Sequence, residues 1–340
     1  MSENKKTVIL GLIGALSIPW LMWWLAGAGW VRILDFALLS VMLSMGLNVV
    51  VGFAGLLDLG FVAFFAVGAY TYALMGSTQF NWHWPLWVVL PSAGLLAAFF
   101  GVLLGAPTLR LRGDYLAMVT LGFGEIIRIF LNNLNQPINI TNGPQGIGDI
   151  DPITLGVVSL GSPWVTPWGR IPAVLNYYYF FLVLAYAAYW VAHRLEFSRL
   201  GRAWLAICQD ETAAQSLGLH THRLKLQAFA VGAFWGGISG ALFAGFQGFI
   251  SPESFTLQES VMILCMVVLG GMGNISGVVL GAFLLTLLPE FLRWISEQQQ
   301  HWFGETWIPA SQLRLLLLGI TLVLVMLRRP QGLWPRRKVV

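Results

Sequence analysis

The sequence predicts an all-α integral membrane protein, a polytopic bundle of about ten transmembrane helices. Hydrophobic residues make up 57% of its 340 residues and charged residues only 10%, and the mean hydropathy is +0.73. A soluble protein of this composition would have too few polar side chains to cover its surface. The apolar residues also form runs of roughly twenty, the length that crosses about 30 Å of hydrocarbon.

Each predicted helix is an apolar run bounded by polar residues, glycine or proline. In chain order the predicted segments are 8–27, 33–53, 56–76, 86–106, 115–133, 174–192, 226–248, 258–271, 277–296 and 312–327. The eighth segment is short and ends in Gly270-Gly271-Met272-Gly273. It is therefore expected to be either a full span or a re-entrant or broken helix. Residues 1–340 are expected to form a single transmembrane domain.

The positions of the basic residues predict the orientation. With the N-terminus in the cytosol, most of the 19 lysines and arginines lie on the cytosolic side, as the positive-inside rule requires. Both termini are then cytosolic, loop 134–173 is external and loop 193–225 is cytosolic. The first segment follows two lysines and is expected to be an uncleaved anchor, with a cleaved signal peptide as the alternative. The charge of +4 does not indicate a nucleic-acid partner, because the basic residues are scattered.

Small residues recur at every fourth position of two predicted helices. In segment 226–248 the row is Gly232, Gly236, Gly240, Ala244 and Gly248, and in segment 86–106 it is Ala93, Ala97, Gly101 and Gly105. Such rows let backbones approach closely in lipid, where helices gain nothing from hydrophobic burial against one another. We expect a helix-packing face here, with a surface that slides during a transport cycle as the alternative.

Polar and charged residues within the apolar segments are candidates for a transport pathway. Ser44 and Asn48 belong to a polar stripe on segment 33–53 that should face protein or water. They either form hydrogen bonds to other helices or line a polar pathway. Glu125 and Arg128 are three residues apart on segment 115–133, close enough to pair on one face of a helix. They are expected to form a salt bridge, with a gate or a substrate contact as the alternative. Asp58 is expected in a turn that faces the cytosol.

Several enzyme motifs are absent from the sequence. No Gly-Lys dipeptide occurs, so the chain has no Walker-type phosphate loop and should not hydrolyse ATP by that route. The five histidines form no His-Glu-x-x-His pair, and no Gly-x-Ser-x-Gly elbow is present. No catalytic residue, metal site or bound cofactor is therefore predicted, and transport energy must come from elsewhere.

Four blocks of sequence resemble the branched-chain amino acid ABC transporter permease family, in particular its larger, LivM-like members. The blocks are Leu47 to Tyr70, Leu111 to Leu131 (LRGDYLAMVTLGFGEIIRIFL), Ser198 to Ala244 around GRAWLAICQDETAAQSLG, and Ser251 to Leu292. They cover about two fifths of the chain, in the family's order. The resemblance implies half of a type II importer in the bacterial inner membrane. Its partners would be a second homologous permease, two cytosolic ATPase subunits that hold ATP and Mg²⁺, and a periplasmic amino-acid-binding protein.

The resemblance also implies a coupling helix at Asp210 to Gly218 that docks on an ATPase. ABC permeases often carry Glu-Ala-Ala-x-x-x-Gly there. Ala213, Ala214 and Gly218 fit this spacing, while Thr212 takes the glutamate position and Glu211 stands one place early. Arg199 and Arg202 would meet the acidic rim of the ATPase cleft, or serve only as topology determinants. Ser44, Asn48 and Glu125 are the expected substrate contacts.

Three other functions remain open from the sequence. A permease for urea or short amides is the alternative within the family. An ion-coupled secondary transporter would need ionisable residues at broken helices, and the sequence suggests Glu125 and Arg128 alone for that role. A purely structural subunit would tolerate changes in the Ser44 and Asn48 stripe.

Overall fold

The computed structural model is mostly helical. It describes residues 16–25, 27–109, 111, 113–136, 139–156, 158–166 and 169–303, together with 316, 319, 320, 323, 327, 328 and 332–334. After a short helix at Leu16–Leu25, the α-helices are α2 (Ala28–Asn48), α3 (Val62–Met75), α4 (Leu86–Thr108), α5 (Asp114–Asn133), α6 (Ala173–Glu196), α7 (Arg199–Gln209), α8 (Glu211–Ser216), α9 (Thr221–Gln247), α10 (Leu257–Gly270) and α11 (Ile275–Phe303). A π-helical turn, Val49–Phe53, extends α2.

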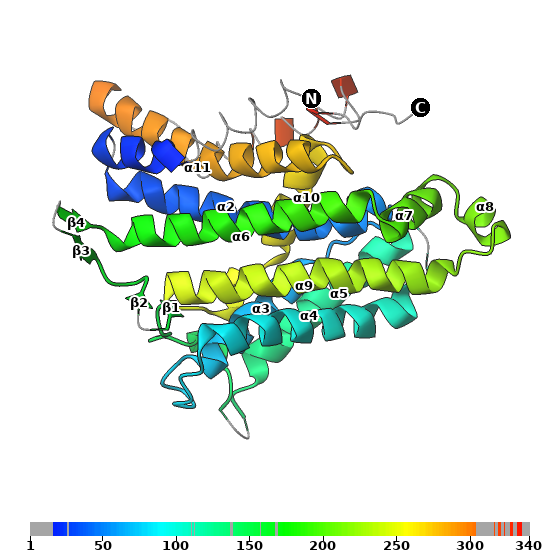
Figure 1. The fold of residues 1–340 in the computed structure, drawn as a ribbon, viewed down its shortest axis with the longest axis horizontal. Helices are drawn as coiled ribbons and strands as arrows, with labels where there is room; N and C mark the ends of the chain where they lie inside the picture. Colours follow the sequence, from blue (N-terminus) through cyan, green and yellow to red (C-terminus); the bar gives the residue numbers. More distant parts are fainter. Residues whose placement is uncertain are drawn as a thin grey trace.

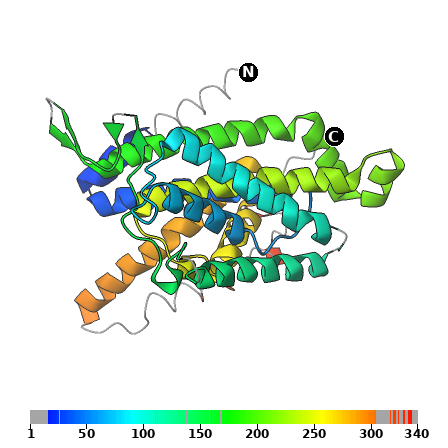
Figure 2. The ribbon, with the colours of Figure 1, turned by 90° about the horizontal axis from the view of Figure 1, so that it is seen from below.

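The long helices run side by side along one axis, with different structures at the two ends (Figure 1). The end that holds α7 and α8 lies opposite two antiparallel hairpins, β1 (Thr154–Leu155) with β2 (Val158–Ser159), and β3 (Trp164–Thr166) with β4 (Gly169–Ile171). A view turned by 90° separates the same two ends (Figure 2). The predicted loops 134–173 and 193–225 therefore lie at opposite ends of the bundle.

Among the described residues, six helices are long and apolar enough to cross a membrane, so the predicted number of about ten is not confirmed. They include α2, α4, α6 and α9 in full, together with Pro252–Gly270 and Ile275–Trp294. Leu16–Leu25 and α3 are apolar but shorter. The predicted segment 312–327 lies outside the described residues, apart from isolated positions. The hairpins show that the expected all-α fold carries a small amount of strand.

Helix α9 packs against three other helices through its small residues. A Cβ atom on Gly232 would lie 2.9 Å from the carbonyl oxygen of Gly46 in α2, and one on Gly240 would lie 2.0 Å from that of Phe65 in α3. A Cβ on Gly236 would meet Phe64 of α3 at 3.2 Å. Beside this row, a Cβ on Gly237 would lie 2.6 Å from a carbonyl oxygen of α4. The glycines thus let three helix backbones approach α9 closely.

Gly248 does not belong to this packing face, which corrects the sequence-based expectation. It follows the last residue of α9 as the C-cap with φ of 73°, and its N–H donates to the carbonyl oxygen of Ala244. A Cβ there would meet nothing within 4 Å. The residue is glycine because a left-handed backbone ends the helix at this point.

Between the π-helical turn and α3, residues 54–61 are not helical and turn back into the bundle. Gly55 lies against Cys208 of α7, at the end of the bundle that carries α7 and α8. Helix α3 begins beside Gly236, which lies about 22 Å from the start of α9, a helix of about 40 Å. This connection therefore runs from that end of the bundle to about half its depth. The hydroxyl oxygen of Thr120, on α5, accepts from the N–H of Leu59 at 3.0 Å. Ser260 of α10 donates to the carbonyl of Leu59 at 2.6 Å.

Asp58 lies within this connection and is fully buried, so the expected position in an exposed turn is wrong. One of its carboxylate oxygens accepts from the N–H of Gly60 at 2.8 Å. A Cβ on Gly60 would lie 2.0 Å from the carbonyl oxygen of Thr120, so α5 packs directly on the backbone of this segment. Non-helical backbone inside a membrane bundle is tolerated where it is buried and hydrogen-bonded in this way.

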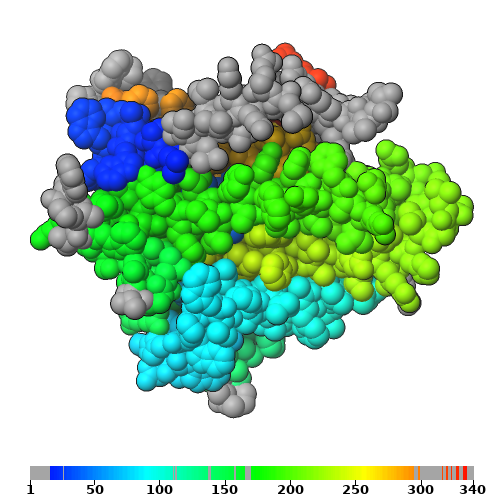
Figure 3. Space-filling view, in the orientation of Figure 1, coloured from blue at the N-terminus to red at the C-terminus, as the bar shows by residue number. Residues whose placement is uncertain are grey.

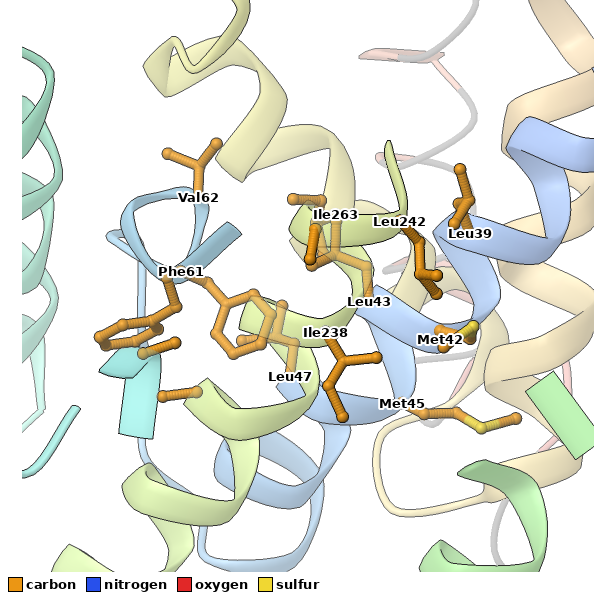
Figure 4. Packing of buried hydrophobic residues seen from close by; sticks show 14 of the residues in the cluster. Leu39, Met42, Leu43, Met45, Leu47, Phe61, Val62, Ile238, Leu242 and Ile263 are labelled. Carbon is orange, nitrogen blue, oxygen red and sulfur yellow. The ribbon is translucent and has the colours of Figure 1, made fainter. Parts of the chain in front are cut away.

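The buried hydrophobic core lies where α2, α3, α9 and α10 meet. Figure 4 shows Leu39, Met42 and Leu43 of α2 packed beside Leu242 of α9 and Ile263 of α10, with Phe61 and Val62 at the start of α3. The chain reverses direction between α10 and α11, where a Cβ on Gly270 would lie 2.3 Å from the carbonyl oxygen of Gly277. These contacts hold the short helices α3 and α10 in place.

Candidate functional site

The end of the bundle that carries α7 and α8 is the first candidate site. Ser198 caps α7, because its Oγ accepts from the N–H of Gly201 at 3.1 Å. Trp204 is fully buried, and its indole N–H donates to the carbonyl of Leu224 in α9 at 2.7 Å. A Cβ on Gly201 would lie 2.0 Å from the carbonyl oxygen of Leu195. Helix α7 is thus fastened to both α6 and α9.

Helix α8 begins with a side-chain cap and is tied to α9 by an ion pair. Asp210 accepts from the N–H groups of Thr212 and Ala213 at 2.8 and 3.0 Å. The ammonium of Lys225 lies 2.6 Å from the carboxylate of Glu211, and the lysine side chain is only 7% exposed. Glu211 therefore holds α8 against the bundle. A buried charge of this kind is stabilised only while its partner is present.

The outer side of α8 is open to solvent. Thr212 and Ala213 are exposed, Ala214 is buried, and Leu217 is 81% exposed. Gly218 ends the segment with φ of 83°, and a Cβ added to it would meet no atom within 4 Å. Figure 3 shows α7 and α8 as one rounded projection from the bundle.

Arg199 and Arg202 lie on the exposed side of α7, next to α8 in the chain. The guanidinium of Arg202 donates to the carbonyl of Phe197 at 3.3 Å. The two arginines and α8 thus share the same end of the molecule, as expected from the sequence. An acidic partner surface that approached α8 would also meet these positive charges.

The predicted pathway residues are not gathered in one place. Ser44 is fully buried and donates to the sulfur of Met266 at 3.4 Å. Asn48 is 2% exposed, and its side-chain oxygen accepts from the N–H of Gly273 at 2.9 Å. Both residues fasten α2 to the α10–α11 region. Of the alternatives left open for this stripe, the structure shows interhelical hydrogen bonding at these two positions.

A cavity of about 330 Å³, here called the aromatic cavity, opens beside Ser40, one turn before Ser44 on the same stripe. Its walls come from α2, α3, α9, the turn before α10, and α10 itself. The lining residues are Phe36, Leu39, Ser40, Leu43, Val62, Phe65, Phe243, Ser254, Glu259, Ile263 and Met266. Most of this surface is apolar, with two hydroxyls and one carboxylate as its polar groups.

Glu125 lines a second cavity, here called the Glu125 cavity, of about 320 Å³. Val62, the first residue of α3, lines both cavities. The guanidinium Nε of Arg128 donates to Glu125 at 3.0 Å, and another nitrogen of Arg128 lies 3.4 Å from Glu253. The salt bridge expected between Glu125 and Arg128 is present, and Glu125 also lines a cavity, while its role as a gate or substrate contact stays a prediction.

Sequence patterns did not point to two further charged positions. Asp35 lies inside α2 and is fully buried, and Arg32 one turn earlier donates to Gln247 at 3.1 Å. Glu259 lies in the first turn of α10 and lines the aromatic cavity. The signal was an acidic residue inside or at the start of a predicted span. Within the described residues, no three His, Cys, Asp or Glu side chains are placed to hold a metal ion.

Comparison with known proteins decides the family. The family model described as branched-chain amino acid transport system / permease component matches residues 29–326, which is most of the chain. The chain belongs to this permease family. The predicted resemblance is therefore confirmed.

Individual members of the family match over different lengths. The chain is 42% identical to the high-affinity branched-chain amino acid transport system permease protein LivM of Escherichia coli K12, over 98% of this chain and 76% of that protein. It is 26% identical to the probable LivM of Methanocaldococcus jannaschii, over 74% and 70%. The LivH permease of Escherichia coli K12 is 33% identical over 27% of this chain and 29% of LivH. No solved structure matches the chain.

Proposed function

We propose that this permease is one of two membrane subunits of an ATP-driven importer for branched-chain amino acids. The main support is its 42% identity, over 98% of its length, to a permease whose name states that transport activity. A second permease subunit related to LivH would complete the translocation pathway. The partial similarity of the chain to LivH supports such a pairing of related subunits.

The energy would come from two separate ATPase subunits in the cytosol. The chain itself contains no Gly-Lys dipeptide and therefore no Walker-type phosphate loop. The projection formed by α7 and α8 offers the docking surface, with exposed Ala213 on α8, exposed Leu217 directly after α8, and the two arginines on α7. In this arrangement that end and both chain termini face the cytosol. A substrate-binding protein would deliver the amino acid at the opposite end, beside the hairpins.

Transport would follow from a switch between two packings of the helices. ATP binding draws the ATPases together and moves α8, and the ion pair between Glu211 and Lys225 passes that movement to α9. Helix α9 contacts α2, α3 and α4 through bare backbone, so its displacement reaches the walls of both cavities. The ligand and ATP need only stabilise the two packings to different extents. The substrate undergoes no covalent change.

Reconstitution of the complete importer tests this function. The chain should co-purify with a second permease and two ATPases, and proteoliposomes with the loaded binding protein should accumulate leucine only when ATP is present. Uptake that follows an imposed ion gradient without ATP would contradict the proposal and identify a secondary transporter. Uptake of urea or short amides in place of aliphatic amino acids would retain the ATP-driven mechanism and contradict the substrate.

A further inference from the structure

The aromatic cavity has the dimensions and chemistry of a small-ligand site. Its volume of about 330 Å³ falls at the lower end of the range of roughly 300–1,000 Å³ that is usual for ligand pockets. Phe243 lies near the end of α9 that adjoins the hairpins, and Ser254 lies just before α10. The cavity is therefore in the half of the bundle that would receive substrate from outside.

The walls of this cavity suit a branched aliphatic side chain. The ring centroids of Phe65 and Phe243 are 5.2 Å apart, and those of Phe36 and Phe243 are 6.2 Å apart. Leu43 and Ile263 add branched aliphatic surface, and Figure 4 shows them close together between α2 and α10. An aliphatic group that enters this space loses contact with water and gains dispersion contacts on several sides.

The polar groups of the cavity suit an ammonium group. Glu259 supplies a carboxylate, and Ser40 and Ser254 supply hydroxyls. Among the described residues that line the cavity, none is basic. Glu259 is an exposed residue, so its carboxylate can be reached by the ammonium of a ligand that enters the cavity and attracts that charge.

We propose that the aromatic cavity binds the amino acid in transit, with its side chain among the three phenylalanines and its ammonium on Glu259. This inference rests on the proposed function and adds a location and two specific contacts to it. A lipid tail would fill the apolar part alone and would gain nothing from the carboxylate. Removing the charge of Glu259 should therefore weaken the binding of an amino acid but not that of a structural lipid.

The first test fills the cavity in the complete reconstituted importer. Ile263 lines the cavity and is 4% exposed, whereas Val261, on the same helix, is 37% exposed and does not line it. Ile263→Trp should lower leucine uptake at least fivefold, while ATP hydrolysis stimulated by the loaded binding protein stays within twofold of the wild type. Val261→Trp should leave both rates within twofold. Normal uptake by an assembled Ile263→Trp importer would overturn the proposal.

The second test removes the charge and does not depend on how tryptophan is accommodated. Glu259→Gln should lower leucine uptake at least fivefold while ATP hydrolysis is retained. Glu259→Asp keeps the negative charge and should show higher leucine uptake than Glu259→Gln. Glu290→Gln, on α11 and outside the cavity lining, is the matched control and should transport normally. A smaller loss with Glu259→Gln, or an equal loss with Glu290→Gln, would refute the ammonium contact. A wild-type importer that hydrolyses ATP but takes up no aliphatic amino acid would instead refute the proposed function.

Discussion

At the scale of single residues, two polar side chains on one helix stripe have different structural importance. Asn48 accepts from a buried backbone N–H of Gly273, whereas Ser44 donates to the thioether sulfur of Met266. Asn48→Ala should leave that N–H without a partner and lower the free energy of unfolding by about 1–3 kcal/mol. Ser44→Ala should cost less, because sulfur is a weak acceptor. Thermal unfolding of the purified chain in detergent measures both, and an equal loss would contradict this assignment.

The sequence could identify these polar residues but not their partners. A serine and an asparagine four positions apart predict a face turned away from lipid. The partners of Ser44 and Asn48 lie more than 200 positions later in the chain, so local spacing could not distinguish a pathway lining from a packing contact. Gly248 shows a related limit. Its place in a four-residue row predicted packing, but the row does not reveal where the helix ends.

At the scale of elements, the backbone contact of α9 with α3 leaves no room for an added side-chain atom. Gly240→Ala would bring a methyl group to 2.0 Å from the carbonyl oxygen of Phe65, so the two helices must separate. Overpacking of this kind typically costs about 1–3 kcal/mol. Gly122→Ala on α5 is the control, because a Cβ there meets nothing within 4 Å. Gly240→Ala should lower the unfolding temperature in detergent and Gly122→Ala should not.

The attachment of α8 to α9 can be tested through its ion pair. Glu211→Gln removes the partner of Lys225, a side chain that is only 7% exposed, and should loosen α8. The double change Glu211→Gln with Lys225→Met removes both charges and should restore much of the attachment, because no unpaired charge remains buried. The rate of proteolytic cleavage between residues 209 and 221 measures the effect. Cleavage as fast in the double variant as in the single one would argue against this role.

Hydropathy predicted the existence of the long helices well but not all of their bounds. The predicted segment 56–76 is apolar apart from Asp58 and Thr71, yet α3 begins only at Val62. The residues before it run as non-helical backbone, held by side chains of α5 and α10. An apolar run has the same hydropathy in either conformation, so only tertiary contacts decide between them.

At the scale of the whole molecule, the two ends of the bundle have different surfaces. One end carries the hairpins and the turn before α10, and the other carries the projection of α7 and α8 (Figure 1). Sequence resemblance identified the family and placed a short helix within Asp210 to Gly218, where α8 lies. The position of the aromatic cavity could not be foreseen, because its walls come from four helices and one turn that are distant in the chain.

Cross-linking is the most direct test of the proposed docking of a separate ATPase on α8. Leu217 is 81% exposed at the end of α8, and Trp87, which is 68% exposed, lies at the start of α4 near the opposite end. In a Cys208→Ser background, a short reagent with a maleimide at one end and a photoreactive diazirine at the other should join Leu217→Cys, but not Trp87→Cys, to an ATPase subunit in membranes of cells that express the complete importer. A Leu217→Cys chain that forms no cross-link, while the same membranes show ATP-driven leucine uptake, would contradict the claim.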